Sequence, residues 1–169
     1  FNFLQNHKAE KGGEHTHTSI LGGSYNIPDE EYEKFLYIYT NELKKNKNEL
    51  SITEKHLPDI SPFIIDLDFR FDKDKSERQY DLELIIEICD VYVKIFNKIF
   101  DSPNTEYYIM QRPSFYLDNS FHKDGVHIHF PFIVTEYWFQ YYIRHRMLPI
   151  VSKKLSSLDL TNSINDIYD

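Results

Sequence analysis

Hydrophobic and polar residues alternate along residues 62–71 with the period of a β-strand. Because successive side chains on a strand point to opposite faces, one face is wholly apolar and the other carries Asp66, Asp68 and Arg70 beside Ile64. The pattern predicts a strand with one face in the core and two carboxylates on the other. The predicted core face comprises Phe63, Ile65, Leu67, Phe69 and Phe71.

A second segment, residues 125–134, has the same character. Gly125, His127 and His129 occupy its polar face, and a glycine there lets a ligand or another backbone approach closely. A single histidine on a strand is usually structural, but two strands that share this pattern favour a site. The predicted apolar face comprises Val126, Ile128, Phe130 and Phe132.

Apolar residues at helical spacing predict two helices, over 76–100 and 136–156. Pro149 lies inside the second helix and is expected to kink or split it. The expected buried set of the first helix is Leu82, Ile85, Ile86, Cys89, Val93, Phe96 and Ile99 or Phe100. That of the second is Trp138 or Phe139, Tyr142, Ile143, Met147, Ile150, Val151 and Leu155.

The remaining segments complete an α/β (α+β) plan. Residues 106–112 are β-like, 119–124 are expected to form a loop and 158–169 a final strand. Strand, helix, strand, strand, helix, strand is the βαββαβ order of ferredoxin-like and RNA-recognition-type (RRM-like) domains, whose helices cover one sheet face. In its usual strand order the first and third strands are neighbours and the fourth flanks the first. Asp66, Asp68 and His127 would then share the open face.

Residues 1–60 are expected to form an N-terminal α/β accessory layer, and residues 61–169 the core that carries the site. In the accessory layer, glycine pairs flank a short predicted strand over 15–21. A helix is predicted over 29–45, and residues 41–58 are expected to be a polar linker. The core spacing of this helix comprises Tyr32, Phe35, Leu36, Tyr39 and Leu43.

Composition sets limits on the class of protein. With 169 residues and 41% hydrophobic content, the chain can build one good core or a domain with a small accessory unit. Its single cysteine, Cys89, excludes an internal disulfide. No apolar run approaches the roughly 20 residues that span a membrane, and nothing resembles a signal peptide. Because the chain starts at Phe1 and ends in an acidic half-motif, we expect a fragment of a longer protein.

The net charge of −8 is unusual for a nucleic-acid-binding protein, which normally benefits from a positive surface. The acidic residues, however, cluster at 29–33, at 72–87 and near the C-terminus. One basic cluster on a predicted helix could follow a phosphate backbone or be an ordinary solvated face. It comprises Arg144, Arg146, Lys153 and Lys154, and a second cluster comprises Lys44, Lys45 and Lys47.

The sequence resembles the archaeo-eukaryotic primase superfamily at three short motifs. The acidic motif is similar to Ile64-Ile65-Asp66-Leu67-Asp68, and the small-residue-x-His motif to Lys123-Asp124-Gly125-Val126-His127. The hydrophobic-Asp motif is similar to Ile167-Tyr168-Asp169, with Asn165-Asp166 as the alternative. The closest resemblance is to the primase portion of the primase-helicases of poxviruses and other large nucleocytoplasmic DNA viruses. Upstream blocks at 15–18 and 22–28 extend it over residues 15–169.

This resemblance implies a DNA primase that synthesises short primers on single-stranded DNA. Asp66, Asp68 and Asp169 would hold two divalent cations, Mg²⁺ or Mn²⁺, and His127 would contact the phosphates of a nucleoside triphosphate. Gly125, Lys123 and Arg112 are further nucleotide-binding candidates, with Arg70 a weaker one. The implied partner is a helicase domain downstream in the same polypeptide. The implied location is intracellular, in a viral replication compartment of the host cytoplasm or nucleus.

Several alternatives stay open at this level. Asp66 and Asp68 could simply mark an edge strand that runs into a charged loop. They could also serve a metal-dependent nuclease, or the fold could be a non-catalytic module that stacks single-stranded bases on aromatic side chains. The predicted open face carries acids and histidines rather than aromatic residues, which speaks against stacking. A zinc site is a further alternative, built from His15, His17, His127, His129 and Cys89.

Overall fold

The computed structural model describes residues 2–45, 51–55 and 59–168. It divides into two compact units, Phe1–Leu57 and Pro58–Asp169, and each is described by itself. Within the described part of the chain, no helix combines the length and apolar character that crossing a membrane requires.

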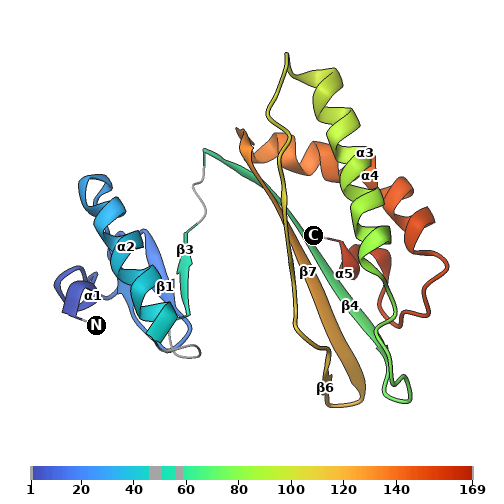
Figure 1. Ribbon diagram of the computed structural model, residues 1–169, viewed down its shortest axis with the longest axis horizontal. Helices are drawn as coiled ribbons and strands as arrows, with labels where there is room; N and C mark the ends of the chain where they lie inside the picture. Colours follow the sequence, from blue (N-terminus) through green and yellow to red (C-terminus); the bar gives the residue numbers. More distant parts are fainter. Residues whose placement is uncertain (1, 46–50, 56–58, 169) are drawn as a thin grey trace. The chain divides into compact units, whose positions relative to one another are not determined.

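The first unit is a small antiparallel sheet with two helices. The sheet order is β2-β1-β3, and both outer strands pair with β1 in antiparallel orientation (Figure 1). Its core consists of Leu4, Tyr25, Ile27 and Phe35. The elements are α1 (Asn2–Asn6), β1 (His17–Ser19), β2 (Ser24–Tyr25), α2 (Asp29–Lys45) and β3 (Ile52–Glu54).

Helix α2 has the predicted bounds, but only part of its predicted core face is buried. Phe35 is 2% exposed and Tyr32 and Tyr39 pack partly against the core, whereas Leu36 and Leu43 are 43% and 37% exposed, contrary to prediction. The narrow sheet covers a single stripe of the helix. The predicted linker over 41–58 is also wrong where it is described, because its start continues α2 and Ile52–Glu54 form β3 against β1. The rest of that segment lies outside the described residues.

The second unit is built on two long strands. Sheet order is β4-β7-β5, with β6 also paired to β7, and every pairing is antiparallel (Figure 1). The elements are β4 (Ile60–Asp72), α3 (Leu82–Ile99), β5 (Tyr108–Gln111), β6 (Tyr116–Asp118), β7 (Phe121–Glu136), α4 (Tyr137–Leu155) and α5 (Ile164–Ile167). The mixed α+β class is confirmed, and the first and third predicted strands are neighbours.

The final predicted strand is wrong in form. Residues 164–167 form the short helix α5, and only Tyr168 makes a strand-like bridge, to Leu67 on the free edge of β4. Ser163 immediately precedes the helix, and its hydroxyl donates to the Asp166 carboxylate, so local side-chain bonding favours a helical turn here. The end of the described chain therefore does flank β4, but through one residue pair (Figure 1, beside the mark C).

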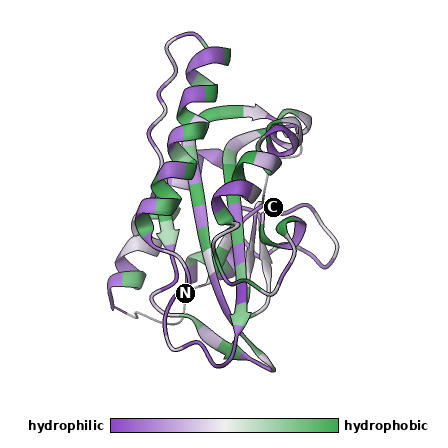
Figure 2. Ribbon diagram, turned by 90° about the vertical axis from the view of Figure 1, so that its right-hand side faces the viewer, coloured by the Kyte–Doolittle hydropathy of each residue, from purple (hydrophilic) through white to green (hydrophobic). Residues whose placement is uncertain are grey.

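Burial alternates along β4 as predicted, with the odd-numbered residues from Ser61 to Phe71 buried. Figure 2 shows the alternation of hydrophobic and hydrophilic residues along the long strands. On β7 the alternation changes phase at an irregularity opposite Pro62 and Phe63. Ile133 and Thr135 are therefore buried, and Phe132, predicted to be in the core, is 54% exposed. The predicted loop over 119–124 is also wrong, because β7 begins at Phe121.

Helix α3 is shorter than predicted, and its buried stripe matches the prediction only in part. Its first residue is Leu82, preceded by Asp81, whose carboxylate accepts a 2.8 Å hydrogen bond from the Leu84 amide. Ile85, Cys89 and Phe96 are buried as predicted, whereas Leu82 and Ile86 are exposed, contrary to prediction. Val93 packs partly against the core, and of the alternatives Ile99 and Phe100 the first is exposed and the second packs partly against the core. The complete buried stripe comprises Ile85, Ile88, Cys89, Tyr92 and Phe96.

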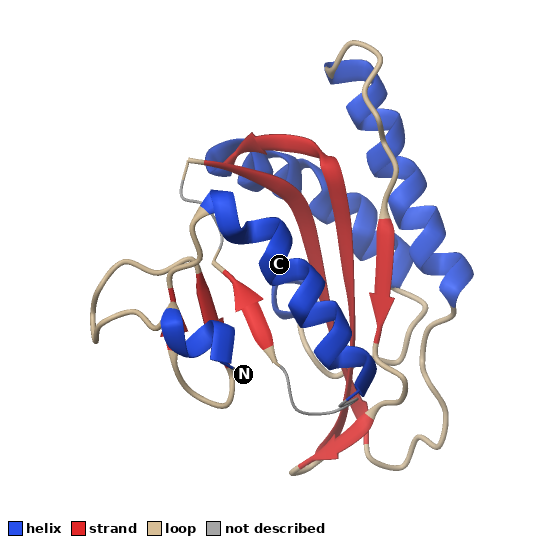
Figure 3. Cartoon of the chain, turned by 60° about the vertical axis from the view of Figure 1, so that its left-hand side comes forward, coloured by secondary structure: helices blue, strands red, loops and turns tan. Residues whose placement is uncertain are grey.

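Helix α4 runs unbroken from Tyr137 to Leu155, so Pro149, which is exposed, does not split it. Ile143, Met147, Val151 and Leu155 are buried as predicted, at a constant spacing of four residues. The predicted burial of Tyr142 and Ile150 is wrong, since these side chains are exposed. Of the alternatives Trp138 and Phe139, Trp138 is exposed and Phe139 packs partly against the core. Buried residues of α3, α4 and α5 join those of β4 and β7 in one core cluster, so these helices cover the same face of the sheet (Figure 3).

Candidate functional site

The face of the sheet opposite this core brings three predicted site residues together. Asp66 of β4 lies directly opposite His127 of β7, and His127 Nε2 is 3.2 Å from Asp66 Oδ1. Their side chains are 42% and 58% exposed, so the pair is accessible to solvent. Asp68, two residues along β4, points to the same face and is exposed.

Gly125 leaves room above the strand pair next to Asp68. The two residues are cross-strand partners, and a Cβ atom at position 125 would lie 3.3 Å from both Asp68 Oδ1 and the Leu67 carbonyl oxygen. It would also lie 3.7 Å from Arg112 Nε. The missing side chain therefore leaves space between the Asp68 carboxylate and the Arg112 guanidinium, and the approach of a ligand or another backbone expected from the sequence stays a prediction.

The predicted cationic residues lie around these acids. Arg112, which follows β5, donates its backbone N–H to the Gly125 carbonyl at 3.3 Å and places its guanidinium 5.2 Å from the Tyr116 ring. Lys123 pairs with Asp118 at 2.6 Å, and its cross-strand partner is Arg70. The open face thus carries positive charge on the side of Asp68 that faces away from Asp66.

The third predicted acid is not placed. Asp169 lies outside the described residues, and the alternative, Asp166, is exposed and accepts a 2.7 Å hydrogen bond from Ser163. What is described is the residue before Asp169. Tyr168 is buried, bridges Leu67 and accepts a 3.0 Å hydrogen bond from Arg144 Nε at its carbonyl.

Asn162 also holds this segment to β4, a role that the sequence did not reveal. Its Nδ2 donates to the Asp68 carbonyl at 2.8 Å, and its Oδ1 accepts from the Arg70 amide at 3.0 Å. The side-chain amide thus satisfies two backbone groups of the β4 edge in the manner of a neighbouring strand. It supports the backbone on which Asp68 stands.

A divalent cation is compatible with this donor set. Two carboxylates at positions i and i+2, with space over Gly125, offer the oxygen ligands that Mg²⁺ and Mn²⁺ prefer. The described residues contain no group of three or more His, Cys, Asp or Glu side chains arranged to hold a metal. A complete ligand set therefore requires a further acid, for which Asp169 is the candidate.

Zinc fits less well. Cys89 is buried in the α3 stripe, and burial raises the pKa of its thiol to about 12, whereas zinc binds the thiolate. His15 and His17 belong to the first unit, and His17 is buried there beside Phe35. The five zinc candidates do not form a site among the described residues.

The aromatic content of the open face differs from expectation. The open face is not devoid of aromatic residues, because Tyr108 is 52% exposed opposite His129, and Met110 is 51% exposed opposite His127. The sequence argument against a base-stacking surface is therefore wrong. The alternation of Tyr108, Ile109 and Met110 in the β-like segment was the sequence signal that could have revealed this exposed aromatic residue.

The basic residues of α4 are partly committed to contacts within the protein. Arg144 Nη2 donates to the carbonyls of Asn165 and Tyr168, and Lys154 pairs with Glu87 of α3 at 2.5 Å. Arg144 and Lys154 thus contact other parts of the protein and are less available to follow a phosphate backbone, which was one of the two interpretations of this cluster.

The second unit combines an antiparallel sheet, helices on one of its faces and, on the other face, a carboxylate pair opposite a Gly-x-His strand, which is the arrangement that the motifs of archaeo-eukaryotic primases imply. The model of the family described as "C962R protein N-terminal AEP domain" matches residues 15–169. The chain belongs to this family of archaeo-eukaryotic primase (AEP) domains, which confirms the resemblance seen in its motifs.

One curated relative is a viral protein. The chain is 31% identical over 170 residues to "Putative helicase L207/L206" of Acanthamoeba polyphaga mimivirus. The match covers 96% of this chain but only 18% of the relative, so the chain spans less than a fifth of that protein's length.

Proposed function

We propose that this chain is a DNA primase domain that transfers nucleotides onto a growing primer paired with single-stranded DNA. The observation that carries the proposal is the register of β4 against β7, which sets Asp66 opposite His127 and Asp68 opposite Gly125 on the open face of an AEP domain. These positions coincide with two of the three motifs of the superfamily.

Asp66, Asp68 and Asp169 would hold the divalent cations in this proposal. The ions would activate the attacking 3′-hydroxyl and neutralise charge on the triphosphate, which is their general role in nucleotidyl transfer. The carboxylates themselves would orient the cations and balance part of their positive charge. Asn162 and the Tyr168 bridge support the proposal, because they hold the β4 edge and bring the chain beside it one residue before Asp169.

His127 and the neighbouring cations would bind the triphosphate. The His127 imidazole can donate a hydrogen bond to a phosphate oxygen from the open face. Arg112 offers a planar donor fork that matches phosphate oxygens, and Lys123 offers a point charge. Gly125 would leave room for the phosphate chain between them.

The exposed side chains of β5 suggest where a single strand would lie. Tyr108 and Met110 stand next to the histidines of β7, and base stacking on aromatic side chains is tolerant of sequence. A template needs such tolerance. The same surface is compatible with a non-catalytic single-strand binder, which is therefore the second candidate function.

The wider setting is part of the proposal. By the name of its mimivirus relative, the domain would act beside a helicase in the same polypeptide. We infer that it works inside infected cells, in a viral replication compartment.

Titration of a nucleoside triphosphate with and without Mn²⁺ tests the proposal. The double variant Asp66→Asn, Asp68→Asn should remain folded and lose the cation-dependent part of the binding. A matched control is Asp59→Asn, Asp72→Asn, which removes the same charge from exposed positions at the two ends of the strand. This control should bind as the original chain does.

Two outcomes would contradict a primase. Binding that ignores both the cation and the substitutions at 66 and 68 would make the acidic pair structural and leave the single-strand binder as the better candidate. Degradation of single-stranded DNA by the chain with Mn²⁺, abolished in the double variant, would indicate the nuclease instead.

A further inference from the structure

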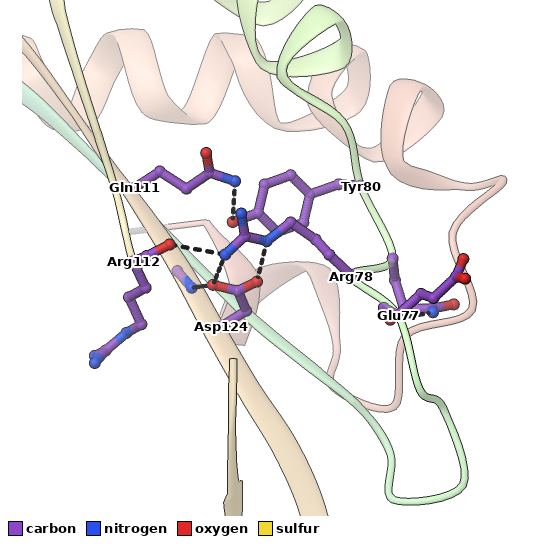
Figure 4. Close-up of polar contacts among 8 residues, drawn as sticks. Glu77, Arg78, Tyr80, Gln111, Arg112 and Asp124 are labelled. Carbon is purple, nitrogen blue, oxygen red and sulfur yellow. Dashed lines mark hydrogen bonds and ion pairs between the residues drawn. The ribbon is translucent and has the colours of Figure 1, made fainter. Parts of the chain in front are cut away.

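Asp124 is the only buried carboxylate among the described residues. It alternates with Lys123 and Gly125 along β7 and so points to the covered face of the sheet, away from the candidate site. Its side chain is 0% exposed, and a buried charge needs a partner. Arg78 supplies two contacts, from Nε to Oδ2 at 2.6 Å and from Nη2 to Oδ1 at 3.3 Å (Figure 4).

The same pair also binds two backbone groups beneath the candidate site. Asp124 Oδ1 accepts from the Gly125 N–H at 2.9 Å, and Arg78 Nη2 donates to the Arg112 carbonyl at 2.8 Å (Figure 4). The Arg112 N–H in turn donates to the Gly125 carbonyl at 3.3 Å. Arg78, Asp124, Gly125 and Arg112 thus form a closed ring of hydrogen bonds, which we call the Arg78 ring.

The Arg78 ring joins three parts of the second unit. Arg78 lies in the segment between β4 and α3, Arg112 follows β5, and Asp124 and Gly125 belong to β7. Tyr80 packs against the guanidinium, with Arg78 Cζ 5.3 Å from its ring centroid. Burial raises the pKa of Tyr80 to about 12, so this phenol stays neutral and does not compete with Asp124 for the cation.

We propose that Arg78 and Asp124 are positioning residues of the nucleotide site, which fix the backbone of Gly125 and Arg112 from the covered face. Gly125 determines the space beside Asp68, and the Arg112 backbone aims a phosphate-binding guanidinium. In this proposal neither Arg78 nor Asp124 contacts the nucleotide, and both act through the backbone of Gly125 and Arg112. The proposal rests on the proposed function, because it assigns these residues to a site whose ligand is a nucleoside triphosphate with its cation.

The substitution Arg78→Lys tests the proposal in the full 169-residue chain. Lysine keeps the charge beside Asp124 but lacks the planar fork that also reaches the Arg112 carbonyl. We expect the Mn²⁺-dependent affinity for a nucleoside triphosphate to fall about tenfold, as is usual when a group that orients a ligand is removed. Arg78→Met, which also removes the charge, should weaken binding further.

A control separates positioning from a general loss of stability. Ile85→Val and Ile88→Ala remove buried methyl groups from α3, and neither residue belongs to the Arg78 ring. The variant of these two whose melting temperature matches that of Arg78→Lys should keep the original affinity. Equal affinities of Arg78→Lys and the original chain, or an equal loss in the matched control, would overturn the proposal.

Amide hydrogen exchange distinguishes failure of this proposal from failure of the proposed function. In Arg78→Lys the Gly125 amide should exchange faster than in the original chain, because its acceptor Asp124 loses the two-point contact with the guanidinium that fixes its carboxylate. If the original chain shows no cation-dependent nucleotide binding, the proposed function fails. There is then no nucleotide site for Arg78 and Asp124 to position. Faster exchange at Gly125 would then support the ring as a backbone restraint, and unchanged exchange would overturn that as well.

Discussion

Gly125 shows how a missing side chain can define a site. A Cβ there would meet Asp68 Oδ1 and the Leu67 carbonyl at 3.3 Å, which is tighter than ordinary van der Waals contact. Either the carboxylate or the strand must move by a few tenths of an ångström. The Asp68 side chain can turn away from the added methyl group, whereas the Leu67 carbonyl belongs to the ladder and can shift only slightly with its strand.

We therefore predict that Gly125→Ala weakens Mn²⁺-dependent nucleotide binding about tenfold while the free energy of unfolding changes by less than about 1 kcal/mol. Calorimetric titration and chemical denaturation measure the two effects. Gly13→Ala is the matched control, because its Cβ would lie 3.2 Å from the Glu10 carbonyl in the other unit. Unchanged affinity in Gly125→Ala would show that the space over Gly125 does not matter for the ligand.

The sequence was sufficient to find Asp66, Asp68 and His127, because their spacing along strands is local information. It was not sufficient for Asp124, which lies in the same motif as Gly125. Its partner Arg78 is 46 residues away in a segment predicted to be helical, and only the packed structure brings them together. Asp124, which the sequence shows only as a member of the Gly-x-His motif, is buried on the covered face of the sheet and pairs there with Arg78.

At the scale of elements, the N-terminus of α3 has a clear chemical cause. Asp81 accepts from the Leu84 amide, which satisfies one of the donors left unpaired in a first helical turn. We predict that Asp81→Ala lowers the free energy of unfolding by about 1 kcal/mol. Asp81→Asn should be close to the original, because asparagine caps about as well. Chemical denaturation measures both, and equal stabilities of the alanine and asparagine variants would contradict the cap.

The errors in the predicted elements have physical causes of the same kind. On α3, helical spacing is compatible with burial of either of two adjacent stripes. In the structure Tyr92 is buried, and its hydroxyl contacts that of Tyr168 in the core. On β7, the irregularity opposite Pro62 and Phe63 shifted the buried face by one residue. The period and composition of a segment predict that a helix or strand exists. Which of its sides is buried depends on packing partners that are distant in sequence.

At the scale of the whole chain, a buried histidine makes the stability of the first unit dependent on pH. In the first unit His17 is 3% exposed, and its Nδ1 lies 2.8 Å from Thr16 Oγ1 while its ring packs edge-on against Phe35. Burial lowers the pKa of His17 below its ordinary value of 6.5, and nearby Glu54 only partly opposes this. The folded unit therefore favours the neutral form of this histidine more than the unfolded chain does.

Because the pKa of His17 is lower in the folded than in the unfolded state, the unfolded state takes up the proton first as the pH falls. The stability that His17 contributes is thus fully present above pH 6.5 and is lost as the pH falls through the folded pKa. We predict that protection of amides in residues 2–45 against hydrogen exchange, corrected for intrinsic rates, decreases between about pH 7.5 and pH 5.5. His17→Gln should reduce this pH dependence, whereas His145→Asn, at an exposed position on α4, should leave it unchanged. An equal pH dependence in His17→Gln and the original chain would assign the acid sensitivity of the unit to other groups.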